Sequence, residues 1–122
     1  MSSLYQAVIL DHAKHPRNRG MLPDATHRGR AENPTCGDRL SMDVIVNDGV
    51  IQDIRFDGAG CAISQASASL LTEAVKGKSI KEALALGRED ILALLGVTLT
   101  PNRLKCALLA LETLKKTLRP KH

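Results

Sequence analysis

Three cysteines and one aspartate are the residues of this sequence with the clearest capacity for chemistry. Cys36 and Asp38 lie two residues apart within Asn33-Pro34-Thr35-Cys36-Gly37-Asp38, whereas Cys61 and Cys106 stand alone further along the chain. An odd number of cysteines cannot form a complete disulfide framework, so the alternatives are inert buried thiols, a reactive thiol or a metal site. Three thiolates and a carboxylate could complete a tetrahedral zinc shell, or hold an iron–sulfur cluster with one oxygen ligand.

The spacing of the cysteines does not decide among these alternatives, because the sequence contains no Cys-x-x-Cys pair and no zinc-finger pattern. In an extended chain the side chains of Cys36 and Asp38 point to the same side. His12 and His27 compete with Asp38 for a fourth ligand position. We prefer Asp38 because its proximity to Cys36 is local and needs no assumption about the fold.

Cys61 and Cys106 are each expected at a position that favours a chemical role. Cys61 directly follows Gly58-Ala59-Gly60 at a predicted strand-to-helix junction, where the positive end of the helix favours the thiolate. On the last predicted helix, Cys106 falls about 140° from the middle of the apolar stripe, counting about 100° per residue. A cysteine kept only for packing should lie within that stripe. The stripe is formed by Leu104, Ala107, Leu108, Leu111, Leu114 and Leu118.

The first half of the chain predicts a helix followed by a small antiparallel sheet. Apolar residues recur at helical spacing from Leu4 until Pro16 stops the helix, and residues 17–35 read as a loop with room for a short edge strand. Residues 40–47 then alternate between apolar and polar, as a half-buried strand does. Asn47-Asp48-Gly49 supplies a turn, and a return strand places Val50, Ile54 and Phe56 on one apolar face.

The second half of the chain predicts helices only. One helix covers residues 62–75 and ends near Gly77, a short helix begins with a Ser79/Glu82 capping box, and residues 90–95 add a turn or two. Thr100-Pro101 opens a last helix that runs to Leu118. We therefore expect a single α+β domain over residues 1–122, in which the N-terminal and C-terminal helices pack on one face of a sheet of about three strands.

Composition and charge narrow the class of protein. The 122 residues contain no apolar stretch long enough to span a membrane and no basic leader of a signal peptide, so we expect a soluble cytoplasmic protein. The net charge is +4, but the chain has one Phe, one Tyr and no Trp. Because single-strand nucleic-acid binders need aromatic stacking platforms, the charge favours an acidic protein partner rather than nucleic acid.

Four sequence blocks resemble one known family when they are taken together. The sequence is similar, over essentially its whole length, to the U-type iron–sulfur cluster assembly proteins (SufU, IscU and the N-terminal part of NifU). The resemblance implies that Cys36, Asp38, Cys61 and Cys106 are the ligands of a metal or cluster. The blocks are Leu4-Tyr5 through Leu10-Asp11-His12 to Pro16-Arg17-Asn18; Asn33 to Asp38; Gly58 to Ser64 with Ala66-Ser67-Ala68-Ser69; and Arg103-Leu104-Lys105-Cys106.

Within that family the residues before Cys106 separate two branches. IscU-like members carry a histidine directly before the last cysteine and a Leu-Pro-Pro-Val-Lys motif ahead of it, whereas this chain has Lys105 and Leu99-Thr100-Pro101-Asn102-Arg103. The residues Cys-Ala-Ile-Ser and Ala-Ser-Ala-Ser are also similar to SufU, and this resemblance implies a zinc site that accepts sulfur from a SufS-type cysteine desulfurase for downstream assembly proteins. We expect Cys36 to be the acceptor, because it lies in a glycine-containing loop that can swing. Arg103 and Lys105 would offset part of the negative charge of the site.

Two other functions stay open at this point. Typical SufU proteins have an extra segment before the last helix, and the short stretch between Gly77 and Cys106 is of IscU length, so a scaffold for a transient [2Fe–2S] cluster or iron is one alternative. A zinc-stabilised interaction module without sulfur chemistry is another. A cysteine hydrolase is disfavoured because no cysteine has an evident histidine–acid pair.

Overall fold

A computed structural model gives the structure of the chain and describes residues 3–34 and 37–119. Within these residues, five helices and three strands follow one another in the predicted order, and the first strand forms in the stretch where an edge strand was expected. The order is α1 (Ser3–Lys14), β1 (His27–Asn33), β2 (Asp38–Asn47), β3 (Val50–Ala59), α2 (Ala62–Val75), α3 (Ile80–Leu84), α4 (Arg88–Leu95) and α5 (Pro101–Leu118).

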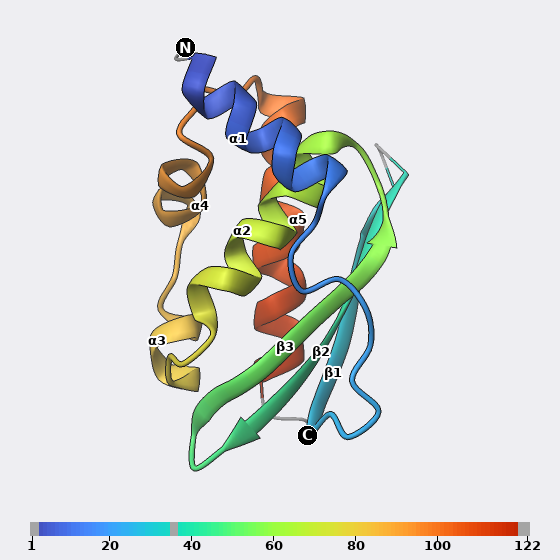
Figure 1. Cartoon of the computed structure of the whole chain (residues 1–122), viewed down its shortest axis with the longest axis vertical. Helices are drawn as coiled ribbons and strands as arrows, with labels where there is room; N and C mark the ends of the chain where they lie inside the picture. The colour runs from blue at the N-terminus through green and yellow to red at the C-terminus, as the bar shows by residue number, and fades with distance from the viewer. Residues whose placement is uncertain (1–2, 35–36, 120–122) are drawn as a thin grey trace.

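The helices form one layer and the sheet forms the other (Figure 1). The three strands are antiparallel and lie in the order β1-β2-β3. Helix α5 packs against β1 and β2, α2 packs against β3 and α5, and α1 lies against α2. This arrangement confirms the predicted α+β fold with helices on one face of the sheet. Among the described helices, none is long and apolar enough to cross a membrane.

The β2–β3 hairpin forms where the sequence predicted it, with one difference in its buried face. Asp48 and Gly49 have φ angles of 53° and 74°, the left-handed conformation that a two-residue hairpin turn requires. A register shift between Ile45 and Val46 then moves the apolar face of β3 by one residue. The prediction that Val50 faces the core was therefore wrong, since Val50 is 39% exposed and Ile51 is fully buried.

Local caps position the shorter elements as expected. Ser79 accepts a hydrogen bond from the Glu82 amide at 3.0 Å, and the Glu82 carboxylate accepts one from the Ser79 amide at 3.1 Å, so the predicted capping box is confirmed. Gly96 ends α4 in the left-handed conformation. Helix α5 begins at Pro101 after Thr100, as predicted.

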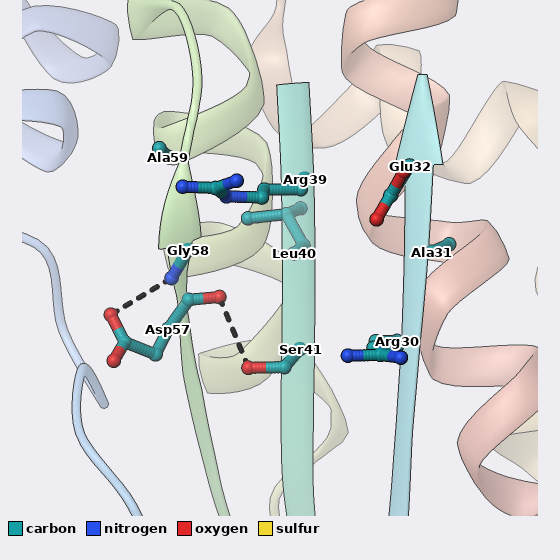
Figure 2. A pocket seen from close by; sticks show the side chains of 9 residues that line it. All are labelled: Arg30, Ala31, Glu32, Arg39, Leu40, Ser41, Asp57, Gly58 and Ala59. Atoms are coloured by element: carbon teal, nitrogen blue, oxygen red, sulfur yellow. Dashed lines mark hydrogen bonds between the residues drawn. The ribbon is translucent and has the colours of Figure 1, made fainter. Parts of the chain in front are cut away.

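The face of the sheet turned away from the helices is polar. Arg30, Ser41 and Asp57 lie side by side across the three strands, and the Ser41 hydroxyl donates to the Asp57 carbonyl at 3.4 Å (Figure 2). A shallow cavity of about 350 Å³ lies here, and the Arg39 side chain extends across it toward Ala59. The mixed charges of this face agree with a surface that water solvates.

Strand β1 lies unusually close to α5, and a glycine permits that approach. A Cβ atom at Gly29 would lie 2.5 Å from Thr117 Oγ1 and 2.9 Å from Thr117 Cα. The second contact involves main-chain atoms, so rotation of a side chain cannot relieve it. We conclude that Gly29 sets the distance between β1 and α5.

Substitution of Gly29 by alanine should destabilise the protein, because α5 must then move away from β1. Overpacking of this kind costs about 1–3 kcal/mol in the free energy of unfolding. Urea denaturation of Gly29→Ala measures the loss, and Arg30→Ala on the exposed face of β1 is the matched control. Equal stability of the two variants would show that the β1–α5 distance is adjustable.

A buried histidine joins α1 to α2. His12 Nδ1 lies 2.7 Å from the Ser69 hydroxyl, which also accepts a hydrogen bond from the Arg17 amide at 2.8 Å. Burial is the largest cause that lowers the pKa of His12 below its ordinary value of 6.5, and the nearby Arg17 charge lowers it further, against the opposing effects of Glu73 and Asp11. These contacts agree with the preference for Asp38 over His12 as a ligand.

The lowered pKa of His12 predicts a stability that falls in mild acid. Between the folded-state pKa and 6.5 the unfolded chain binds more protons at this residue than the folded chain, so the free energy of unfolding decreases as the pH falls through that window. Denaturant titrations across the window should show a shallower pH dependence for His12→Asn than for wild type. His15→Asn, at an exposed neighbouring histidine, should leave the dependence unchanged.

Candidate metal centre

Asp38 is a buried carboxylate at the first residue of β2. It is 3% exposed, and its Oδ1 accepts a hydrogen bond from the Cys61 amide at 3.2 Å. Its Oδ2 lies 3.8 Å from Cys61 Sγ. A carboxylate this deeply buried is costly without donors or cations around it. The described contacts supply one backbone donor and one thiol.

Cys61 stands at the junction of β3 and α2, as the sequence predicted. It is the N-cap residue of α2, with extended backbone angles, and its side chain makes no capping hydrogen bond. The Ser64 hydroxyl and the Gln65 amide both donate to the Cys61 carbonyl, at 3.0 Å and 3.1 Å. Both backbone groups of Cys61 are therefore hydrogen-bonded, the amide to Asp38 and the carbonyl to the first turn of α2. The thiol between them lies at the positive end of the helix.

Cys106 lies on the buried face of α5, and the prediction that it falls outside that face was wrong. It is 4% exposed and shares the face with Thr113 and Thr117, whereas Leu104 and Leu108 are only half-buried. Each threonine hydroxyl donates to the carbonyl four residues earlier, at 2.7 Å, which allows these polar residues to be buried. The buried face is therefore rotated away from the leucine stripe, toward Cys106.

These three residues converge from three separate elements. One ligand atom each of Asp38, Cys61 and Cys106 lies within 4.8 Å of the other two. Sulfur ligands around a tetrahedral zinc ion are separated by about 3.8 Å, given a Zn–S distance of about 2.3 Å. A carboxylate oxygen and two thiols at this spacing are a donor set that fits zinc after a small contraction. Among the described residues, neither His12 nor His27 joins this group.

The fourth predicted ligand, Cys36, lies outside the described residues, so its prediction stays untested. Gly37 follows it with a φ of 73°, and the Gly37 amide donates to the Asn33 carbonyl at 2.9 Å.

The cavity over the site contains one basic residue. It has a volume of about 250 Å³ and is lined by Asp38, Cys61, Asn102, Arg103 and Cys106. Lys105 instead lines a neighbouring cavity with Asn33 and Pro34. The positive charge expected near the thiols is therefore supplied at the cavity wall by Arg103.

Sequence reasoning missed the role of Gly60, which permits the close approach of Asp38. A Cβ atom at Gly60 would lie 2.9 Å from Asp38 Oδ1 and still closer to the Ser64 hydroxyl, which is itself fully buried. Gly60 is not among the glycines with positive φ, so this close approach is what requires glycine here. The signal available in the sequence was a glycine directly before Cys61 at the end of a strand, which often marks close approach of another group.

The sequence matches the family described as "NifU-like N terminal domain" over residues 4–120. It is 41% identical to the zinc-dependent sulfurtransferase SufU of Bacillus subtilis, over 95% of this chain and 90% of that protein. It is 40% identical to the iron–sulfur cluster assembly scaffold protein IscU of Streptococcus pyogenes, over 98% of this chain and 85% of that protein.

A solved structure shares the fold. The crystal structure of a protein from Fervidobacterium islandicum, described as a scaffold for iron–sulfur cluster assembly in the SUF system, superposes with a TM-score of 0.83 at 27% identity. The match covers 98% of this chain and 96% of that one.

The contact between Gly60 and Asp38 predicts an energetic coupling between them. Gly60→Ala should push the carboxylate away from the Cys61 amide and cost about 1–3 kcal/mol in the free energy of unfolding. In an Asp38→Ala background the same substitution should cost less, because the carboxylate is absent. A double-mutant cycle from urea denaturation of the metal-free protein measures this coupling. Additive costs would contradict the assignment of Gly60 as the residue that positions Asp38.

Proposed function

The chain belongs to the family of NifU-like N-terminal domains, and from that membership we propose that it acts in iron–sulfur cluster assembly as a zinc-dependent sulfur acceptor. Its partner in this proposal is a SufS-type cysteine desulfurase of the cytoplasm. The observation that carries the proposal is the convergence of Asp38, Cys61 and Cys106 within 4.8 Å, next to a cavity that opens toward Asn102 and Arg103.

The donor set is suited to thiolate chemistry at neutral pH. Zinc bound at Asp38, Cys61, Cys106 and Cys36 would hold the cysteines as thiolates. Cys61 is the N-cap residue of α2, and its side chain makes no capping hydrogen bond that would compete with a metal. Arg103 at the cavity wall provides a positive charge for a site with several anionic donors. These residues can therefore hold a thiolate that is ready to react.

In the proposed transfer, the Cys36 thiolate attacks the outer sulfur of a persulfide on the desulfurase cysteine. A new sulfur–sulfur bond forms on Cys36, the sulfur–sulfur bond of the donor breaks, and the electron pair leaves on the donor thiolate. One persulfide is consumed and one is formed, so no external oxidant or reductant is needed. Cys36 is our choice for the acceptor because Gly37 follows it directly in the sequence, and glycine gives the backbone conformational freedom.

A second function is supported by the similarity to IscU proteins. The identity to the scaffold protein of Streptococcus pyogenes is close to the identity to SufU of Bacillus subtilis. In that function the same donors would receive a transient [2Fe–2S] cluster as cargo, and Asp38 would be the oxygen ligand whose exchange lets the cluster leave.

Metal content distinguishes these functions. The purified protein should contain tightly bound zinc and be colourless, and Cys61→Ser, Cys106→Ser and Asp38→Asn should each lower the zinc content. Asp57→Asn, an exposed carboxylate at the same end of the sheet, is the matched control and should retain it. Iron with labile sulfide and a brown colour would favour the scaffold, and the absence of any bound metal would contradict both functions.

Turnover of a SufS-type desulfurase tests the sulfur-acceptor role. The protein should accelerate alanine release from cysteine and take up a persulfide sulfur that mass spectrometry detects on Cys36. Cys36→Ser should abolish both effects. If that variant still stimulates the desulfurase and accepts sulfur, Cys36 is not the acceptor. Zinc binding without any stimulation would instead indicate an interaction module.

A further inference from the structure

A basic groove lies on α5, beyond the candidate metal centre along the same helix. It has a volume of about 370 Å³, and we define it by four cations and two leucines: Arg88, Lys115, Lys116, Arg119, Leu108 and Leu111. Three of the cations come from the last turns of α5, and Arg88 is the first residue of α4. The groove is therefore built between two helices rather than on one surface.

The cations of the groove have little compensation from the protein itself. Lys116 lies 3.5 Å from Glu112, but within the described chain the side chains of Arg88, Lys115 and Arg119 have no ion pair and no hydrogen bond. By contrast, Arg19 and Arg55 on the sheet side of the molecule each pair with an aspartate. Among the described residues, Glu112 is the one carboxylate that lines the groove. Its charge leaves a clear positive excess.

The groove also has apolar walls, which a merely solvated basic surface does not need. Leu108 is half-buried and Leu111 is 7% exposed, and both line the cavity between the cations. An apolar side chain that entered here would contact both leucines while acidic neighbours met Arg88, Lys115 and Arg119. This combination of a small apolar pocket and a charged rim is typical of a protein interface.

We propose that the basic groove binds an acidic segment of a partner protein, in which carboxylates flank a leucine-like side chain. Charge complementarity argues against a second copy of this chain, since each copy has a net charge of +4. It also argues for protein over nucleic acid, because bases need aromatic platforms and Phe56 is fully buried, with one Tyr as the remaining aromatic residue.

A partner held in the groove would leave the candidate metal centre accessible. At about 1.5 Å per residue along a helix, Lys115 lies about 14 Å beyond Cys106 on α5. The two sites share this rigid helix but not their lining residues. The groove is thus a second contact surface, and its existence does not depend on which metal or sulfur chemistry the first site performs.

The test uses a fluorescent acidic peptide of alternating glutamate and leucine blocks, with the purified full-length chain. Neutralising the groove by Arg88→Gln, Lys115→Gln and Arg119→Gln should weaken binding about tenfold, a change of about 1.4 kcal/mol that the three exposed ion pairs share. The matched control neutralises three exposed cations elsewhere, with Lys14→Gln, Arg30→Gln and Arg39→Gln. It changes the net charge equally and should bind the peptide as wild type does.

Two further measurements keep the proposal falsifiable if the groove variant folds poorly. On the wild-type protein, a peptide with serine in place of each leucine should bind more weakly, and added salt should weaken binding of the leucine peptide. Equal binding of the two peptides, equal binding by the two triple variants, or no binding at all would overturn the proposal. So would tighter binding of single-stranded DNA, or dimerisation in sedimentation that the groove variant abolishes.

Discussion

The hydrogen bond from the Cys61 amide to the Asp38 carboxylate connects the first residue of β2 to the residue that begins α2. These residues are 23 positions apart, and the β2–β3 hairpin lies between them. The bond requires that the end of β3 approach a buried negative charge, which Gly60 permits because it lacks a Cβ atom. The start of α2, the end of β3 and the start of β2 are consequently fixed relative to one another, and α5 closes the remaining side with Cys106.

Local sequence signals were sufficient for most of the fold. The Asp48-Gly49 turn, the Ser79/Glu82 capping box and Thr100-Pro101 each act within a few residues, so each could be predicted from the sequence and is confirmed. Strand β1 was harder, because its sequence HRGRAEN is polar and forms a strand through pairing with β2 and contact with α5. The exposure of Val50 depends on a register shift between β2 and β3, where Gln52 of β3 is left without a partner residue in β2. The alternation of apolar residues in β3 does not reveal this shift.

The candidate metal centre could be proposed from its residue types, but its surroundings could not. The capacity of thiols and a carboxylate for metal chemistry is visible in the sequence, and the structure brings Asp38, Cys61 and Cys106 together. The buried face of α5 was misjudged because Thr113 and Thr117 bond to their own helix and so pack like apolar residues. The histidines could be set aside only once their positions were known, since His12 bonds to Ser69 and His27 to Thr26.

The three donors come from β2, from the N-cap of α2 and from α5. This has a consequence for the order of folding and metal binding during synthesis of the chain. No shorter stretch of the chain brings them together, because the hairpin contributes Asp38 and α5 contributes Cys106. A nascent chain that has completed its sheet but not α5 therefore presents an incomplete donor set. An ion that uses all three donors could bind only after α5 has docked, and its binding free energy would then stabilise the finished fold.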